Sequence, residues 1–486
     1  MPMGNRPRTV SIHILNDDSL LHVFYLYRPL FKGEAGPADW RYSGRWWYAL
    51  AHVCRRWRNI LLGSATYLDL SLLCTYGTPV ADMLAHSPPL PLVVSYFYKN
   101  RQLTTKDEEG IILALKQHDR VRRVRLGNAC KILEKLIVAM DEECPILEFL
   151  HISRPIEDTT TILRFSESFQ APHLRHLLLG SFALPTVSRL LTTAVGLVKL
   201  HLDMVHPSTY FHPNTLIRWI SLMPQLEALD ILHFSIPNRD AERRLTHIPI
   251  IAPVVLPNLH HLRFHGVSTY LEALVYRITI PRLQKLHIEF SSQLTFSVPR
   301  LLQSIIAAES FRLGNAVLTF DDKIVGAGVY PYGKTNVYAL GITVKSCHLD
   351  WQASSMAQIF DSLSQIFSEV EHLALQHKLH SESSEEHNDV DHTEWRKLLR
   401  PFSNVKTLRV GKGLVKDLSR YLELEDGELR LELLSKLVRL EYSGRGKTRD
   451  FASFVNARRN AGRPVTLVRL PDPSDYNDEQ PVWIDT

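Results

Sequence analysis

The side chains in this sequence that could do chemistry are basic residues and histidines that alternate with apolar residues in short runs. They are Lys199, His201, His261, Arg263, His265, Lys285 and His287. Alternate residues of a β-strand share one face, so these side chains are expected opposite the apolar ones. Basic groups gathered on one face attract carboxylates and phosphates. The pattern predicts a surface for acidic or phosphorylated segments, with stronger capture near pH 6, where histidine becomes protonated.

Two other interpretations of this face remain open. One is an ordinary solvated face, in which Asp203, Asp230 and Glu289 neutralise the basic residues. The other is a zinc site built from the last three histidines of the set, if their strands are adjacent. Those histidines have no cysteine or carboxylate at a fixed spacing, so we expect no metal.

Signatures of catalysis are absent from the sequence. It contains no G-x-S-x-G, G-x-x-x-x-G-K-[ST] or H-E-x-x-H motif. The run Gly326-Ala327-Gly328 lacks a third glycine and a following helix, so we expect a turn there. Cys54 is expected to be a core or interface thiol rather than a nucleophile, because it belongs to an apolar helix face. We therefore expect a protein that is not an enzyme and needs no cofactor; no feature favours a hydrolase or transferase with scattered residues.

One recurring pattern must position the alternating residues: an apolar residue, any two, an apolar residue, any one, and an apolar residue. Copies begin at Val121, Leu147, Leu174, Leu197, Leu226, Leu259, Leu283, Val337 (a weaker copy), Val370, Val405 and Leu437. From Val121 to Leu283, successive copies start 23 to 33 residues apart. This region resembles a divergent leucine-rich repeat array, whose units run at about 20–29 residues. The resemblance implies parallel strands on a concave face, with helices outside.

Helical patterns separate the predicted strands. We expect helices at Thr186–Ala194, Thr215–Met223, Leu301–Ala308 and Met356–Phe367. Proline ends such helices because it has no amide hydrogen, and it stands two residues before the first leucine as Pro145, Pro172, Pro224, Pro257 and Pro281. Irregular first strands are expected at 67–72 and 90–94, with a helix at Val80–His86, and the array should close with a helix at Arg449–Asn460 and a strand at Val465–Leu470.

Two short amphipathic helices are expected before the repeats. Asn16 and Asp17 can cap the first, whose apolar side carries Leu20, Leu21, Val23 and Phe24. The second helix would place on one face Trp47, Leu50, Val53, Cys54 and Trp57. Helices this short bury little by themselves, so they need a partner surface in this chain or on another protein.

These residues resemble an F-box. Its LPxE-like start, apolar pair and V-C-x-x-W motif correspond to Leu15-Asn16-Asp17-Asp18, Val23-Phe24 and Val53-Cys54-Arg55-Arg56-Trp57. The resemblance is to the F-box proteins abundant in mushroom-forming (basidiomycete) fungi. Asn16 stands where the family usually has proline, and residues 28–43 lengthen the link between the helices. A helical hairpin that merely caps the rest of the chain is the alternative.

The resemblance implies the substrate-recognition subunit of an SCF-type E3 ubiquitin ligase. The F-box would bind a Skp-type adaptor and through it a cullin, the repeats would bind a target protein, and other subunits would transfer ubiquitin. The implied adaptor-binding residues are Leu15, Leu20, Leu21, Val23, Phe24, Leu50, Val53, Cys54 and Trp57. A non-catalytic F-box/leucine-rich-repeat scaffold outside a cullin ligase is the alternative function.

Composition restricts the partners. The 486 residues include 56 basic and 51 acidic ones, and a net charge of +5 is too small to predict nucleic-acid binding. The five cysteines form no C-x-x-C pair, which favours a reducing compartment, the cytoplasm or the nucleus. The start of the chain is polar, and no apolar run approaches the roughly 20 residues of a membrane span, so we expect neither a signal peptide nor a membrane partner.

The predicted fold class is α/β: a short all-α F-box followed by a leucine-rich-repeat-like α/β solenoid. The expected boundaries are 1–8 for a flexible tail, 9–66 for the F-box, 67–470 for the solenoid and 471–486 for a flexible C-terminal tail. The polar, acidic stretch His380–His392 is expected to be a disordered insertion. An ordinary surface loop is favoured there over phosphorylation at Ser381, Ser383 or Ser384.

Overall fold

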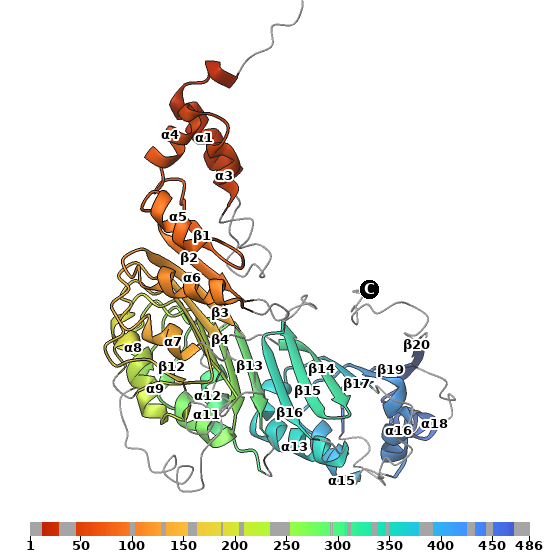
Figure 1. The fold of residues 1–486 in the computed structure, drawn as a ribbon. Helices are drawn as coiled ribbons and strands as arrows, with labels where there is room; N and C mark the ends of the chain where they lie inside the picture. Colours follow the sequence, from red (N-terminus) through yellow and green to blue (C-terminus); the bar gives the residue numbers. More distant parts are fainter. Residues whose placement is uncertain are drawn as a thin grey trace, which may run out of the picture. The chain divides into compact units, whose positions relative to one another are not determined.

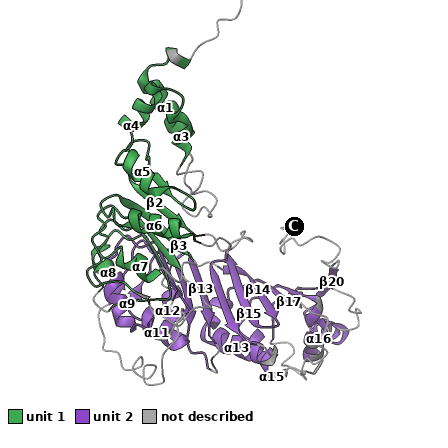
Figure 2. Cartoon of the chain, viewed as in Figure 1, with its two compact units in different colours: residues 1–197 green, residues 198–486 purple. Residues whose placement is uncertain are grey.

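A computed structural model of the chain has two compact units, Met1–Leu197 and Val198–Thr486, coloured separately in Figure 2. Figure 1 labels the helices and strands of both. The structure describes residues 12–28, 45–97, 103–127, 133–153, 163–185, 188–203, 209–233, 253–291, 293, 295–306, 308, 313–331, 338–346, 349–378, 392–424, 433–443 and 451–470. The predicted tails, the link between the first two helices and the acidic insertion therefore lie outside the described residues, apart from Arg28 and His392.

The first unit begins with the 3-10 turn η1 (Ile12–Ile14) and helix α1 (Asp17–Tyr27). Asn16 caps α1 as predicted: its side-chain oxygen accepts a hydrogen bond of 2.8 Å from the backbone N–H of Ser19. A cap of this kind satisfies an amide that has no partner inside the helix. Asn16 thus has a defined structural role at the start of α1.

The prediction of one helix from Trp47 to Trp57 is wrong. Helix α3 (Trp46–Ala51) ends before Val53, and a separate helix α4 (Arg55–Gly63) begins after Cys54. Cys54 is extended, and its sulfur accepts a 3.5 Å hydrogen bond from the backbone N–H of Trp57. The side-chain cap replaces the backbone bond that a continuous helix would make, so the apolar spacing spans a break.

In the rest of the first unit, helices alternate with parallel strands in the order β1-β2-β3-β4-β6. These strands are β1 (Leu72–Cys74), β2 (Leu92–Tyr96), β3 (Val121–Gly127), β4 (Phe149–Ser153) and β6 (His176–Gly180). The helices are α5 (Val80–His86), α6 (Thr105–Leu115), α7 (Leu133–Val138) and α8 (Arg189–Thr193), and β5 (Leu163–Arg164) pairs with β7 (Phe182–Ala183). The helix predicted at Val80–His86 is confirmed.

The second unit continues this alternation, with strand order β8-β9-β11-β13-β16-β15-β14-β17-β18-β19-β20. They are β8 (Lys199–Asp203), β9 (Ala228–Leu232), β11 (His261–Gly266), β13 (Lys285–Phe290), β16 (Leu340–Lys345), β15 (Ile324–Pro331), β14 (Leu313–Asp321), β17 (His372–Lys378), β18 (Thr407–Val410), β19 (Arg439–Ser443) and β20 (Thr466–Leu470). The helices of this unit are α9 (Pro213–Ile220), α11 (Ser268–Val275), α12 (Pro299–Ile306), α13 (Leu349–Ser362), α14 (Ser364–Phe367), α15 (His392–Leu399), α16 (Val415–Leu424) and α18 (Ala452–Asn460). A 3-10 turn, η3 (Lys412–Leu414), precedes α16. Two short strands, β10 (Val254–Val255) and β12 (Ile278–Thr279), form a separate parallel pair.

The recurring leucines form the core of this sheet. Leu200, Leu229, Leu262, Leu286 and Leu340 are Cα partners across successive parallel strands, and none is more than 1% exposed. Helices cover the same apolar face: one such contact stacks a phenylalanine of β11 on a tyrosine of α11, with ring centroids 6.0 Å apart. The predicted parallel register of these strands is confirmed.

The prediction of a turn at Gly326-Ala327-Gly328 is wrong, because these residues lie inside strand β15. Val325, Ala327 and Val329 alternate into the core, so the glycines fall on the opposite face. β15 pairs antiparallel with both β14 and β16, whereas β16 lies parallel to β13 and β14 parallel to β17. The weak repeat copy near Leu340 is therefore the last strand of an antiparallel run. Its first predicted residue lies outside the described part of the chain.

Candidate interaction surfaces

The N-terminal helices have a small internal core. Leu20 and Phe24 of α1 are at most 1% exposed, and Phe24 meets Trp57 of α4 edge to face with ring centroids 5.0 Å apart. Leu61 of α4 is also fully buried. Three of the nine residues assigned to adaptor binding, Leu20, Phe24 and Trp57, are thus inside the helical pair rather than on its surface.

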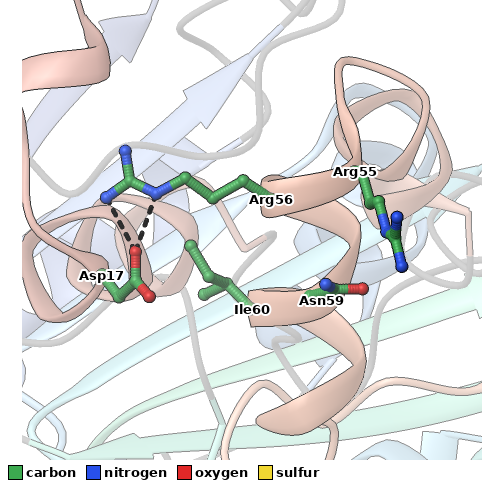
Figure 3. Close-up of a pocket in the computed structure, with 5 residues that line it drawn as sticks. All are labelled: Asp17, Arg55, Arg56, Asn59 and Ile60. Carbon is green, nitrogen blue, oxygen red and sulfur yellow. Dashed lines mark hydrogen bonds and ion pairs between the residues drawn. The ribbon is translucent and has the colours of Figure 1, made fainter.

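Polar contacts fix the start of α1 against α4. The Arg56 guanidinium donates 2.8 Å and 2.6 Å hydrogen bonds to the carboxylate of Asp17 and the backbone carbonyl of Leu15. Beside this ion pair is a pocket of about 450 Å³, lined by Asp17, Arg55, Arg56, Asn59 and Ile60. Figure 3 shows the Arg56 and Asp17 side chains meeting near Ile60. Four of the five lining residues are polar or charged and only Ile60 is apolar, so the pocket suits a polar or charged group that has a small apolar part.

Apolar side chains remain exposed around these helices. They are Ile12, Ile14, Leu15, Val23, Tyr25, Leu26, Tyr27, Val53 and Tyr67. Val23, Leu26 and Tyr27 are three and four residues apart, which makes them neighbours on α1, and Leu26 is 69% exposed. Helix α1 therefore has one apolar side turned inward and a second that remains exposed among the described residues. Exposed apolar surface of this kind is common at protein–protein interaction sites.

The other predicted adaptor-binding residues divide into two groups. Leu15, Val23 and Val53 are exposed, and Leu21, Leu50 and Cys54 are half-buried. Sequence reasoning missed Ile14, Leu26 and Tyr27 in the exposed set. The spacing of Leu26 and Tyr27 after Val23 carried the signal, but the prediction followed the apolar residues of α1 only as far as Phe24.

In the second unit, the predicted basic and histidine residues lie on the sheet face opposite the leucines. The parallel register places Lys199, Ala228, His261 and Lys285 in one row across β8, β9, β11 and β13. The next row holds His201, Asp230, Arg263 and His287. Adjacent positions in such a row are about 4.8 Å apart. All seven residues predicted to bind the target are thus brought together on this strand face, which we call the histidine face.

Carboxylates on the histidine face are paired with its histidines. Asp230 is 7% exposed, and its Oδ2 lies 3.0 Å from His201 Nδ1, while Oδ1 lies 3.5 Å from His261 Nε2. Burial would raise the pKa of Asp230, but the hydrogen bond to His201 and nearby positive charge outweigh it and hold the pKa below its ordinary value. Asp203 contacts His233 at 2.8 Å in the same way. Part of the neutralisation expected for a solvated face is therefore present.

Burial changes the protonation of three predicted histidines. It lowers the pKa of His261 and His287, and it lowers that of His265 to about 4. A lowered pKa keeps an imidazole mostly neutral near pH 6.5. The expected gain of positive charge near pH 6 is therefore reduced at His261 and His287 and absent at His265. The spacing of these residues in the sequence gave no measure of their burial.

Three cations on the histidine face lack a carboxylate within 4 Å among the described residues: Lys199, Arg263 and Lys285. By contrast, Glu289 of β13 lies 3.0 Å from Lys345 of β16 and 3.7 Å from His265. The face thus keeps unpaired positive charge near the starts of its strands and paired charge near their ends. Sequence reasoning missed Lys345 and also His233, which follows β9 with a left-handed backbone (φ 48°).

Lowering the pH from 7 to 5 is expected to reduce the free energy of unfolding by about 2 kcal/mol through His265 alone. The unfolded imidazole binds a proton near pH 6.5, whereas the folded one does so only near pH 4. Stability that depends on neutral His265 is thus present above pH 6.5 and lost as the pH falls toward 4. The charged and titratable groups that act on it are Glu289, Lys345, His233 and Asp203.

Denaturant unfolding at pH 7 and pH 5 checks this effect in the His265→Gln variant. The variant should lose less stability than the wild type between the two pH values, whereas His173→Gln, at an exposed position, should follow the wild type. The hydrogen bond of His233 to Asp203 raises the pKa of His233, so this residue adds stability as the pH falls. The wild type and the variant both retain His233, so its contribution does not affect their comparison. An equal loss in wild type and His265→Gln would contradict the assignment.

No family model matches this sequence, and no curated protein is significantly similar to it. Among the described residues, no three potential ligands lie together in a way that could hold a metal ion. None of the described helices has the length and apolar composition to cross a membrane. The described residues form a mixed α/β fold with mostly parallel strands. They also leave apolar side chains of α1 exposed.

Proposed function

We propose that the chain is the substrate-recognition subunit of an SCF-type E3 ubiquitin ligase. Residues 9–66 would act as an F-box that binds a Skp-type adaptor and through it a cullin. The strands and helices after them would form a leucine-rich-repeat-like solenoid that binds a target protein through the histidine face. Other subunits would carry out ubiquitin transfer, in the cytoplasm or the nucleus.

The observation that carries this proposal is the uncovered apolar side of α1. Val23, Leu26 and Tyr27 are exposed on a helix whose opposite side already packs against α4. Exposed apolar side chains of this size are costly in water and gain about 1.5–3 kcal/mol each when fully buried. A helical adaptor laid along α1 would bury them, and Leu15 with the adjoining pocket would extend the contact.

The double variant Val23→Asp with Leu26→Asp tests the adaptor contact. Truncated anchors at an interface lose about 2 kcal/mol or more, so binding of a purified Skp-type adaptor should weaken by at least about 30-fold. Charged replacements at two exposed positions should leave the chain folded. Leu20→Ala is less suitable, because Leu20 is fully buried and its loss would disturb the helical pair itself.

A matched control replaces two exposed apolar residues on other helices of the same unit, Leu113 of α6 and Val138 of α7, with Asp. The control should bind the adaptor like the wild type. Equal binding by the α1 variant would place the adaptor elsewhere and remove the main support for an F-box. If the adaptor binds but no cullin co-purifies, the chain is instead the non-catalytic scaffold.

A further inference from the structure

An aromatic platform lies on the histidine face where β13, β16 and β15 meet. The Tyr338 hydroxyl is 3.2 Å from His287 Nδ1, and the centroids of these two rings are 5.7 Å apart. Tyr330 stands nearly perpendicular to Tyr338, at 85° and 6.4 Å. Tyr338 is 38% exposed, so part of its ring surface is open to a ligand. We call these three rings the aromatic platform.

Two glycines are what allow the rings to lie against the sheet. Gly328 and Gly341 are Cα partners across β15 and β16. A Cβ on Gly341 would lie 2.7 Å from His287 Nδ1 and 2.8 Å from the Tyr338 ring, closer than side-chain atoms tolerate. A Cβ on Gly328 would lie 3.2 Å from the Tyr330 hydroxyl oxygen. Gly341 is therefore needed for His287 and Tyr338 to lie where they do, and Gly328 leaves room for the end of the Tyr330 side chain.

Unpaired positive charge adjoins the platform. Arg263 is the Cα partner of His287 on the neighbouring strand, and Lys285 precedes His287 by two residues on the same face of β13. The nearest carboxylates have other partners, since Glu289 is paired with Lys345 and Asp230 with His201. Asp230 is the Cα partner of Arg263 on β9, but no described carboxylate lies within 4 Å of the Arg263 or Lys285 nitrogens. An anionic group brought beside His287 would thus meet two cations that have no ion pair among the described residues.

We propose that the histidine face recognises a target segment in which an aromatic side chain stands next to carboxylates or a phosphate. The aromatic side chain would pack on Tyr338 and Tyr330, and the anionic groups would bind Arg263 and Lys285. Ring-on-ring packing selects an aromatic residue, whereas the cations select its acidic neighbours. This inference rests on the proposed role of the histidine face in binding a target.

Fluorescent peptides test the inference on the full chain purified with its adaptor. The probes are Glu-Asp-Phe-Glu-Asp, the same peptide with Ala for Phe, and a phosphotyrosine peptide in a Gly-Ser context. The Phe peptide should bind about tenfold tighter than the Ala peptide, because aromatic packing of this kind is worth roughly one tenfold step. Whichever of the Phe and phosphotyrosine peptides binds more tightly identifies carboxylate or phosphate as the anionic group.

Variants separate the two parts of the site. Tyr338→Ala should abolish the preference for Phe over Ala while leaving weak, salt-sensitive binding of both peptides. Arg263→Glu with Lys285→Glu should weaken both acidic peptides at least tenfold. Tyr276→Ala, at an exposed tyrosine of the same unit, should change neither property.

Three results would overturn the inference: equal binding of the Phe and Ala peptides, a Phe preference that survives Tyr338→Ala, or no binding of any probe. Retention of the adaptor is measured in the same samples. A chain that holds the adaptor but ignores every probe would keep its proposed role in the ligase and lose only this mode of recognition. A chain that binds the Phe peptide through Tyr338 but holds no adaptor would keep this mode of recognition and lose its proposed role in the ligase.

Discussion

Replacing Leu262 with Asp is expected to unfold the central strands of the second unit rather than act locally. Leu262 is 1% exposed and lies between Leu229 and Leu286, its Cα partners on β9 and β13. Removing such a leucine already costs about 2–5 kcal/mol, and a buried carboxylate without a partner adds a desolvation penalty. We expect a loss of more than about 4 kcal/mol, comparable with the whole stability of many domains.

Amide hydrogen exchange measures how far the damage spreads. Protection should be lost in β9, β11 and β13 together, because each strand buries its leucine against its neighbours. Gln284→Asp, at an exposed position just before β13, should leave protection unchanged. If the variant loses protection only in β11, the neighbouring strands are stable independently of it. Peptide binding by the histidine face should disappear with the protection, since β11 carries Arg263.

Replacing Arg458 with Leu is expected to destabilise the C-terminal end of the second unit by about 3 kcal/mol or more. Arg458 of α18 is fully buried, and its guanidinium donates hydrogen bonds of 3.2–3.3 Å to the carbonyls of Leu434, Ser435 and Leu437. Leucine would leave these carbonyls without that donor. The turn is already strained, because Leu434 has a left-handed backbone at φ 51°.

Thermal unfolding of Arg458→Leu and Arg459→Leu compares a buried with an exposed arginine of the same helix. Only the Arg458 variant should melt at a lower temperature, and β19 and β20 should lose exchange protection first. A melting temperature unchanged by Arg458→Leu would show that the turn holds without its buried donor. The proposed binding of an adaptor by α1 should be unaffected by either change.

The repeated leucine spacing was enough to predict most strands, because every residue that the pattern uses must be buried. Leu229, Leu262 and Leu286 satisfy that requirement in register. The prolines indicated where helices end before strands, and Asn16 indicated where the first helix begins. Such signals depend on chemistry within a few residues, which a single sequence displays directly.

Other features could not be predicted in this way. The apolar spacing around Cys54 fits a single helix, and it does not reveal that the Cys54 thiol caps a separate helix by accepting a hydrogen bond from Trp57. A turn is expected at Gly326 because its run lacks a third glycine and a following helix, whereas antiparallel pairing with β14 and β16 places it in strand β15. The neutral state of His265 follows from burial to 5% exposure, which its position in the pattern did not reveal.

The antiparallel strand β15 also affects the direction of everything after it. One reversal of chain direction would make every later strand run the opposite way. The chain reverses twice, once before β15 and once after it. β14 and β16 therefore point the same way, and β17 still runs parallel to the strands before the reversal. An even number of reversals leaves polarity unchanged. Strands β14 and β15 thus widen the histidine face by about 10 Å while the following helices keep their side of the sheet.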